Sequence, residues 1–368
     1  MCGILGTIPS VEREQFLPVL NLLAHRGPDG VGIWEDESKE ITLGHRRLSI
    51  LDLSDDGAQP MHYGRFVILF NGAIYNFLEL KEELEKDGFT FKTKTDTEVL
   101  VAAWQKWGTD VFPKLNGMWA LAIWDKEEKT LVLSRDRFGE KPLFYTTENG
   151  RFAFGSEMKA LVPFLPEVRM ADDFGWMKDH LFDYEPTEKC LIHGIKRFPH
   201  GHYGVYQNGE LKLYKYWNTL EHLHTVPGSY KDQVAEFREL FVDACKIRMR
   251  ADVPMGTALS GGVDSTATIC SMAHVARKMP ERRFSNDWQH AFVASMPGTP
   301  LDETRYAKMV TDYLDIPATF TEIDPVTGIE KLEDYLFQAE ELYITSPVPM
   351  VETYRAARQQ GVKAVSYT

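Results

Sequence analysis

Three things are scarce in this sequence of 368 residues: cysteine, positive charge and long apolar runs. Its four cysteines, Cys2, Cys190, Cys245 and Cys270, match neither a zinc site nor a small disulfide framework, which indicates reduced thiols. The formal net charge of −13 lacks the basic excess of nucleic-acid binders, so we expect no nucleic-acid partner. No apolar run reaches the roughly 18 residues of a membrane helix, and the first residues do not resemble a signal peptide. The sequence therefore predicts a cytoplasmic protein with no membrane partner.

The length and the ordinary composition predict a two-domain globular protein. A chain of 368 residues is longer than one core usually supports, and 43% of its residues are hydrophobic. The local pattern changes twice along the chain. We assign residues 2–165 to a first domain, residues 166–230 to a connecting segment and residues 231–368 to a second domain.

The first domain alternates short apolar runs with turns, which is typical of strands. Its predicted strands are 41–43, 66–70, 119–124, 130–134 and 151–154. Two helices are predicted at 77–87 and 97–107, with Gly88 ending the first and Asp96 placed to cap the second. Many strands and few helices indicate an α+β domain with packed sheets.

The connecting segment is broken by prolines and contains a predicted hairpin with its turn at Asn208-Gly209. The second domain alternates helices with strands, which indicates a parallel α/β sheet. Its predicted helices are 233–248, 265–278 and 303–314. Its predicted strands are 257–259, 290–295, 318–322 and 363–367.

The first candidate for chemistry is Cys2. Removal of Met1 would leave Cys2 with a free α-amine, whose reference pKa is about 7.7–8.0. That amine could accept the proton of the adjacent thiol, so one residue would supply both nucleophile and base. On its own, however, the pattern favours a small buried cysteine at the start of a strand.

Six further segments follow Cys2, and together they are far more specific than Met-Cys-Gly. They are HRGPDG (25–30), GHRRLSILD (44–52), FNGAIYN (70–76), KTDTEV (94–99), RDRFGEKPLFY (135–145) and GSEMKAL (155–161). In this order they resemble the blocks of class II glutamine amidotransferases, in the asparagine synthetase branch. The resemblance covers essentially the whole chain. It implies that the first domain has the stacked antiparallel sheets of an Ntn-hydrolase-like fold and hydrolyses glutamine.

The resemblance implies roles for four residues besides Cys2. Asn71, through its side chain, and Gly72, through its backbone N–H, match the donors of the oxyanion hole. Arg47 matches the clamp for the α-carboxylate of glutamine, and Asp96 matches the partner of its α-ammonium group. Without the resemblance, Arg47 would be interpreted as a surface charge and Asp96 as a helix cap.

One position departs from the family pattern. Ala73 stands where the family commonly has a glutamate that helps to hold the head group of glutamine. This predicts weaker glutamine binding, a shifted specificity or a branch with a different role. His25 and His45 are assigned to structure or to the glutamine-pocket loop, because a free α-amine makes a histidine base unnecessary.

A second motif, SGGVDS, occupies positions 260–265. It follows a short apolar strand and opens a predicted helix, which is the context of a phosphate-binding loop. It is not a Walker A loop, because no Gly-Lys-Ser/Thr follows. It resembles the signature of ATP pyrophosphatases, which cleave ATP between its α- and β-phosphates. The structural alternative is a tight glycine turn with a serine cap, which six matching positions disfavour.

This resemblance implies that the second domain belongs to an ATP-pyrophosphatase fold that uses ATP and Mg²⁺. Backbone amides and hydroxyl groups of the motif would hold pyrophosphate, and Asp264 would bind the metal. The implied ATP-binding residues are Leu259, Ser260, Gly261, Gly262, Asp264, Ser265 and Ala294.

The two half-reactions together imply amide synthesis. A carboxylate substrate, aspartate in the family, would attack ATP and form an acyl-adenylate, and ammonia carried inside the protein would displace AMP to give asparagine. A homodimer is a family expectation. The family continues after its corresponding last strand into a Gly-(Glu/Asp)-Gly-x-Asp-Glu loop, so the resemblance implies a C-terminally incomplete sequence.

Two alternatives stay open. One is a related amidotransferase that acts on another carboxylate in natural-product or cell-envelope modification. β-Lactam synthetase-like enzymes share the second domain, but their first domain typically lacks the cysteine. The other is a non-catalytic or regulatory homologue, which Ala73 favours and which Cys2 and the intact SGGVDS motif disfavour.

Overall fold

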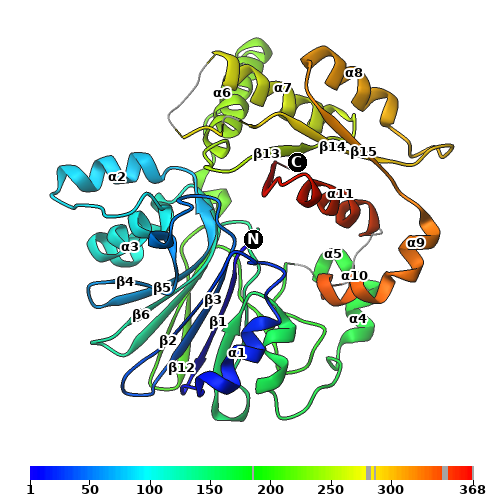
Figure 1. Cartoon of the computed structure of the whole chain (residues 1–368). Coiled ribbons are helices and arrows are strands. Elements are labelled where there is room, and N and C mark those ends of the chain that lie inside the picture. The colour runs from blue at the N-terminus through cyan, green and yellow to red at the C-terminus, as the bar shows by residue number, and fades with distance from the viewer. Residues whose placement is uncertain (185, 279–282, 286, 342–346, 367–368) are drawn as a thin grey trace. The chain divides into compact units, whose positions relative to one another are not determined.

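The computed structural model describes residues 1–184, 186–278, 283–285, 287–341 and 347–366 (Figure 1). The chain divides into two compact units, Met1–Leu223 and His224–Thr368. No helix among the described residues is long and apolar enough to cross a membrane.

The first unit contains two six-stranded antiparallel sheets, with strand orders β10-β8-β9-β1-β3-β2 and β12-β11-β7-β6-β5-β4. The strands of the first sheet are β1 (Gly3–Ile8), β2 (Gly30–Glu35), β3 (Thr42–Arg47), β8 (Phe144–Thr146), β9 (Phe152–Gly155) and β10 (Lys196–Arg197). The strands of the second sheet are β4 (Met61–Tyr63), β5 (Phe66–Ile74), β6 (Gly117–Asp125), β7 (Thr130–Arg135), β11 (His202–Gln207) and β12 (Glu210–Lys215).

Alternating side chains of the two sheets build a core between them. Ile4 and Leu43 of the first sheet belong to the same buried apolar cluster as Val67 of the second. The neighbouring residues Leu5 and Ile68 belong to two other clusters on the outer faces of the sheets. This period of two is what a strand buried on both faces requires. The predicted α+β domain with stacked antiparallel sheets is confirmed.

Helices cover both outer faces of this sandwich (Figure 1). Helix α1 packs on the first sheet, whereas α2 and α3 pack on the second. The helices of the unit are α1 (Arg13–Asn21), α2 (Phe77–Lys86), α3 (Asp96–Trp107), α4 (Phe174–Asp179) and α5 (Leu181–Tyr184).

The ends of α2 and α3 show one correct and one wrong prediction. Gly88 follows α2 at a φ of +87°, a conformation that glycine adopts without strain, and therefore ends the helix as predicted. The N-cap of α3 is Thr95, whose Oγ1 accepts the Glu98 N–H at 3.1 Å. Asp96 is instead the first residue of the helix, because its carboxylate is engaged by the backbone N–H of Ile74 at 3.0 Å.

The predicted hairpin forms, but it is part of the first unit and not of a connecting segment. Asn208 and Gly209 have φ angles of +53° and +82° in its turn. Strand β11 pairs with β7, with Tyr203 opposite Ser134, so β11 and β12 extend the second sheet. The first unit therefore extends to Leu223. The local sequence pattern did not predict this extent, because the pairing of β11 with β7 joins segments that are distant in the sequence.

The second unit has a four-stranded parallel sheet of order β15-β14-β13-β16, which confirms the predicted α/β fold. Its strands are β13 (Met255–Ala258), β14 (His290–Ser295), β15 (Ala318–Glu322) and β16 (Ala364–Ser366). Its helices are α6 (Tyr230–Arg248), α7 (Val263–Lys278), α8 (Thr304–Leu314), α9 (Pro325–Glu330), α10 (Leu332–Ala339) and α11 (Val348–Gln359). Phe292 of β14 packs with Ala356 and Ala357 of α11. The last position of the predicted strand 363–367 lies outside the described residues.

Phe112 provides a test of the hairpin's place in the first unit. Its ring is fully buried and lies 5.4 Å from the ring of Tyr203 and 5.5 Å from that of Tyr216. We expect Phe112→Ala to cost about 3–5 kcal/mol and to lower the urea midpoint of the first unit, followed by tryptophan fluorescence. Phe182→Ala, at a ring that is 78% exposed, is the control and should leave the midpoint unchanged. An unchanged midpoint for Phe112→Ala would contradict the packing.

Candidate functional site

Cys2 lies just before β1, at the point where β3 ends. Its Sγ accepts the backbone N–H of Leu48 at 3.3 Å and lies 3.6 Å from the Leu48 carbonyl oxygen. Burial raises the pKa of the Cys2 thiol, and the negative charge of Asp96 adds to the rise. The thiol is therefore protonated at neutral pH and needs a base before it can act as a nucleophile.

The α-amine of the chain supplies such a group close by. In the unprocessed chain this amine belongs to Met1, and burial lowers its pKa to about 5. The charges of Arg26 and Lys141 lower the pKa further, while Cys2 and Asp29 oppose the shift. The Met1 amine is thus a free base near neutral pH.

Arg26 fixes the backbone of Cys2, a role that the sequence analysis did not assign. Its Nε donates to the Cys2 carbonyl oxygen at 3.0 Å, and its Nη1 donates to Glu157 Oε1 at 2.8 Å. Glu157 also contacts His25 Nε2 at 2.9 Å and Lys159 Nζ at 2.8 Å. Burial alone would raise the pKa of Glu157, but the hydrogen bond from His25 and the charges of Arg26 and Lys159 lower it to about 2. The sequence signal for Arg26 was its place in the HRGPDG segment.

Asn71 and Gly72 lie near the end of β5. The Asn71 side chain is 1% exposed, and its Nδ2 has no hydrogen-bond partner among the described residues. A buried amide nitrogen without an acceptor is costly, which indicates a donor held ready for a bound group. Any side chain at Gly72 would start only 2.3 Å from the Met118 carbonyl oxygen, so the backbone approaches closely only because this residue is glycine.

His45 has a structural role in this region, in line with the sequence analysis. It is 1% exposed on β3, and its Nε2 lies 3.3 Å from the Phe70 carbonyl oxygen, so it ties β3 to the residue before Asn71. Burial lowers the pKa of His45 to about 3, which leaves the ring neutral at physiological pH.

Arg47 and Asp96 are both held by backbone groups. Arg47 Nη1 donates to the Ser54 carbonyl oxygen at 2.6 Å, and its Nη2 donates to that of Asp52. Asp96 is buried and holds the N–H of Ile74, two residues beyond Gly72. Asp96 is thus fixed beside the strand that carries Asn71 and Gly72, and its charge reaches the Cys2 thiol.

The second unit forms the expected strand–turn–helix at the SGGVDS motif. Ser260 Oγ lies 3.0 Å from Ser265 Oγ and accepts the Gly262 N–H at 3.1 Å. Gly261 has a φ of +93°, and a Cβ there would lie 2.8 Å from the backbone nitrogen of Ala307. The loop is therefore a glycine-dependent cradle at the first turn of α7, with two hydroxyl groups gathered inside it.

The remaining predicted ATP-binding residues flank this loop. Leu259 is buried, and its N–H donates to the Phe292 carbonyl oxygen at 2.9 Å, which joins the loop to β14. Ala294 lies near the end of the same β14. Asp264 is exposed in the first turn of α7. No group of three or more potential metal ligands occurs among the described residues.

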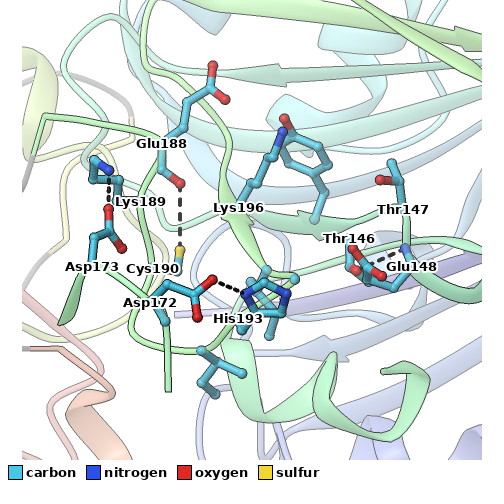
Figure 2. Close-up of a pocket in the computed structure, with 15 residues that line it drawn as sticks. Thr146, Thr147, Glu148, Asp172, Asp173, Glu188, Lys189, Cys190, His193 and Lys196 are labelled. Carbon is cyan, nitrogen blue, oxygen red and sulfur yellow. Dashed lines mark hydrogen bonds and ion pairs between the residues drawn. The ribbon is translucent and has the colours of Figure 1, made fainter. Parts of the chain in front are cut away.

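Figure 2 shows a separate cavity of about 540 Å³ in the first unit. It is lined by residues 145–148, 171–173, 188–190 and 192–196. Its charged side chains include the pair His193 and Asp172, 3.5 Å apart, and the pair Lys189 and Asp173. None of the predicted site residues lines this cavity.

Comparison with known proteins finds one family match in each of the two units. Residues 1–217 match the glutamine amidotransferase domain family, and residues 236–365 match the asparagine synthase family. The chain is 34% identical to glutamine-hydrolyzing asparagine synthetase 3 of Bacillus subtilis, over 78% of this chain and 48% of that relative. It is 30% identical to asparagine synthetase B of Escherichia coli, over 99% of this chain and 62% of the relative.

A third relative is named as an amidase and not as an asparagine synthetase. The chain is 29% identical to Amidase chry2 of Gibberella zeae, over 96% of this chain and 53% of that protein. The chain thus spans about half the length of the curated relatives it matches. Its two matched domains, in this order, show that the chain belongs to the asparagine synthetase family of glutamine amidotransferases.

Proposed function

We propose that the first unit hydrolyses glutamine with Cys2 as the nucleophile, after Met1 has been removed. The observation that carries this proposal is the buried Asn71 amide nitrogen, which has no partner among the described residues. Asn71 lies on β5 next to Gly72. Asp96 accepts the N–H of Ile74 on the same strand, and its negative charge adds to the rise that burial causes in the pKa of Cys2. A protonated thiol, a neutral amine and an unused donor are the groups that attack on an amide requires.

The reaction follows from these groups. The α-amine of Cys2 takes the thiol proton, and the thiolate attacks the side-chain carbonyl carbon of glutamine. The resulting oxyanion accepts hydrogen bonds from Asn71 Nδ2 and the Gly72 N–H. The protonated α-amine passes its proton to the amide nitrogen of glutamine, the C–N bond breaks, ammonia leaves, and a thioester remains. Water, deprotonated by the same amine, attacks the thioester; the C–S bond breaks, glutamate is released, and the proton on the amine returns to the Cys2 sulfur.

Arg47 and Asp96 would recognise the two charges of the glutamine head group. The Arg47 guanidinium is oriented by the carbonyl oxygens of Ser54 and Asp52, and its remaining N–H groups can bind a carboxylate. Asp96 would accept from the α-ammonium group. Because Ala73 brings no carboxylate to this head group, we infer that glutamine binds more weakly than it would with a glutamate at this position.

The second unit would bind ATP at the SGGVDS loop. Ser260, Ser265 and the loop amides form the cradle for pyrophosphate, while Leu259 and Ala294 would contact the nucleotide. Mg²⁺ bound through Asp264 and phosphate oxygens would neutralise part of the phosphate charge. The positive φ of Gly261 and its close approach to the backbone nitrogen of Ala307 support this assignment, since they give a glycine-dependent turn directly before α7.

Together the two units support a glutamine-dependent ligase. A carboxylate attacks the α-phosphorus of ATP, pyrophosphate leaves, and ammonia then displaces AMP from the acyl-adenylate to form an amide. We propose aspartate as the carboxylate, because relatives that align with 78% and 99% of the chain are named asparagine synthetases. Another carboxylate is the second candidate, favoured by the relative named as an amidase.

Replacement of Cys2 tests the first half of the proposal. We expect Cys2→Ala to abolish glutamate release from glutamine, because no other residue supplies this thiol. Cys190→Ala, at a buried cysteine of the same unit, should retain the activity of the wild type. The measurement is the rate of glutamate formation by purified protein whose N-terminus has been verified by mass spectrometry. Wild-type protein that starts at Cys2 and releases no glutamate would favour the non-catalytic alternative.

Replacement of Asp264 tests the second site. We expect Asp264→Asn to weaken binding of magnesium pyrophosphate at least about tenfold, because a metal-binding carboxylate is lost. Binding of pyrophosphate without metal should change little. Titration calorimetry on the full chain measures both, and Asp312→Asn, on the exposed face of α8, is the control. Equal affinities of wild type and Asp264→Asn for the metal complex would exclude the role of Asp264.

A further inference from the structure

Gln59 is a buried polar residue to which none of the roles above applies. It lies just before β4 and is 7% exposed. Its backbone packs directly on β2, because a Cβ added at Gly32 would lie only 1.9 Å from the Gln59 carbonyl oxygen. The side chain of Gln59 therefore starts from a fixed point.

The amide group of Gln59 bridges strand β5 and helix α3. Its Oε1 accepts the backbone N–H of Phe70 at 2.6 Å, and its Nε2 donates to Thr97 Oγ1 at 3.4 Å. Asp96, the residue before Thr97, accepts the N–H of Ile74 at 3.0 Å. The first turn of α3 is thus joined to β5 on both sides of the two proposed oxyanion donors.

These contacts lie on the edge of β5 that points away from β6. Trp119 of β6, which lies opposite Gly72, uses both of its backbone groups on Asp136. Its N–H donates to Asp136 Oδ2 at 3.1 Å, and its carbonyl oxygen accepts the Asp136 N–H at 2.9 Å. Gly72 and Trp119 are therefore a non-hydrogen-bonded pair, so the Gly72 N–H points to the other edge of β5. That edge faces β3, since the Phe70 carbonyl oxygen lies 3.3 Å from His45 Nε2.

The Gly72 N–H lies between two amides that are already engaged. Every second amide of a strand points to the same edge, so those of Phe70, Gly72 and Ile74 form one row. Gln59 accepts the first and Asp96 accepts the third, whereas the Gly72 N–H has no acceptor among the residues that the structure describes. Two buried side chains thus fix the strand and leave one amide between them free for a bound group.

We propose that Gln59 is a positioning residue of the glutaminase, which holds the oxyanion donors of β5 in place through Phe70. This proposal rests on the proposed function of Cys2. Phe70 directly precedes Asn71, so a shift of its backbone would displace both donors. Such donors lower the barrier when they lie about 3 Å from the developing oxyanion, and a misplacement of about 1 Å can cost roughly a hundredfold in rate.

Replacement of Gln59 by methionine tests this role, because methionine keeps the length of the side chain and loses both hydrogen bonds. We expect Gln59→Met to lower kcat for glutamate release roughly ten- to hundredfold and to change KM for glutamine little, because oxyanion donors act on the transition state. Gln105→Met, at an exposed position of α3, is the matched control and should keep the kcat of the wild type. Steady-state kinetics on the full chain, with the N-terminus verified by mass spectrometry, measures both constants.

A second measurement separates positioning of the donors from a general loss of structure. Alkylation of Cys2 by iodoacetamide forms no oxyanion, so its rate in Gln59→Met should equal that of the wild type. Peptide mass spectrometry resolves Cys2 from the other three cysteines. A general loosening of the site would change the alkylation rate together with kcat.

Thr97 provides an independent variant if Gln59→Met does not fold. Thr97→Val removes the acceptor of Gln59 Nε2 and should also lower kcat, by a smaller factor because the bond to Phe70 remains. Thr97→Ser keeps the hydroxyl group and should lose less than Thr97→Val. A wild-type kcat, a change confined to KM, or parallel changes of kcat and alkylation rate would overturn the role of Gln59 and leave the Cys2 assignment intact. Wild-type protein without glutaminase activity would overturn both.

Discussion

The backbone position of Cys2, the proposed nucleophile, depends on one buried ion pair, between Arg26 and Glu157. Arg26 joins the Cys2 carbonyl oxygen at 3.0 Å to Glu157 at 2.8 Å, and Ser156 Oγ accepts the N–H of Ile4 at 3.0 Å. Chain termini are normally poorly ordered unless they are tied down. Here the first residues are fixed to the segment after β9, so that the thiol can stay in register with the end of β3. Because an unpaired partner would be left buried, loss of one member would be strongly destabilising.

This cationic environment explains how a buried thiol can be both inert and ready to react. Desolvation outweighs the attraction of Arg26 and raises the pKa of Cys2, so no thiolate accumulates in the resting protein. In the unprocessed chain, burial and the charges of Arg26 and Lys141 also lower the pKa of the Met1 amine. In the proposed reaction, activation would wait until the proton passes from sulfur to nitrogen. A thiol that stays protonated is also less open to oxidation, because the thiolate is the reactive form.

Sequence patterns predicted the elements whose signals are local. The alternating run of β5 and the glycine after α2 were identified from neighbouring residues alone. Strand β2 was missed because GVGIWE carries two glycines and is only partly buried, and β8 and β10 were missed because they are short. Membership of the hairpin in the second sheet depends on pairing with a distant strand. The burial of Arg26 and Lys141 could not be predicted either, since charged residues are normally exposed.

One glycine at each candidate site lies too close to neighbouring backbone for any side chain. At Gly72 this close packing, and not the neighbouring Ala73, fixes the backbone. Gly72 and Gly261 each lie where an added Cβ would meet backbone atoms, at 2.3 Å and 2.8 Å. The backbone of Gly72, a proposed oxyanion donor, thus depends on the β5–β6 pairing and not on the side chain at position 73. Donors that act on developing charge lower the barrier, whereas contacts with the head group stabilise substrate and transition state alike. A missing carboxylate at Ala73 should therefore raise KM for glutamine and leave kcat largely unchanged.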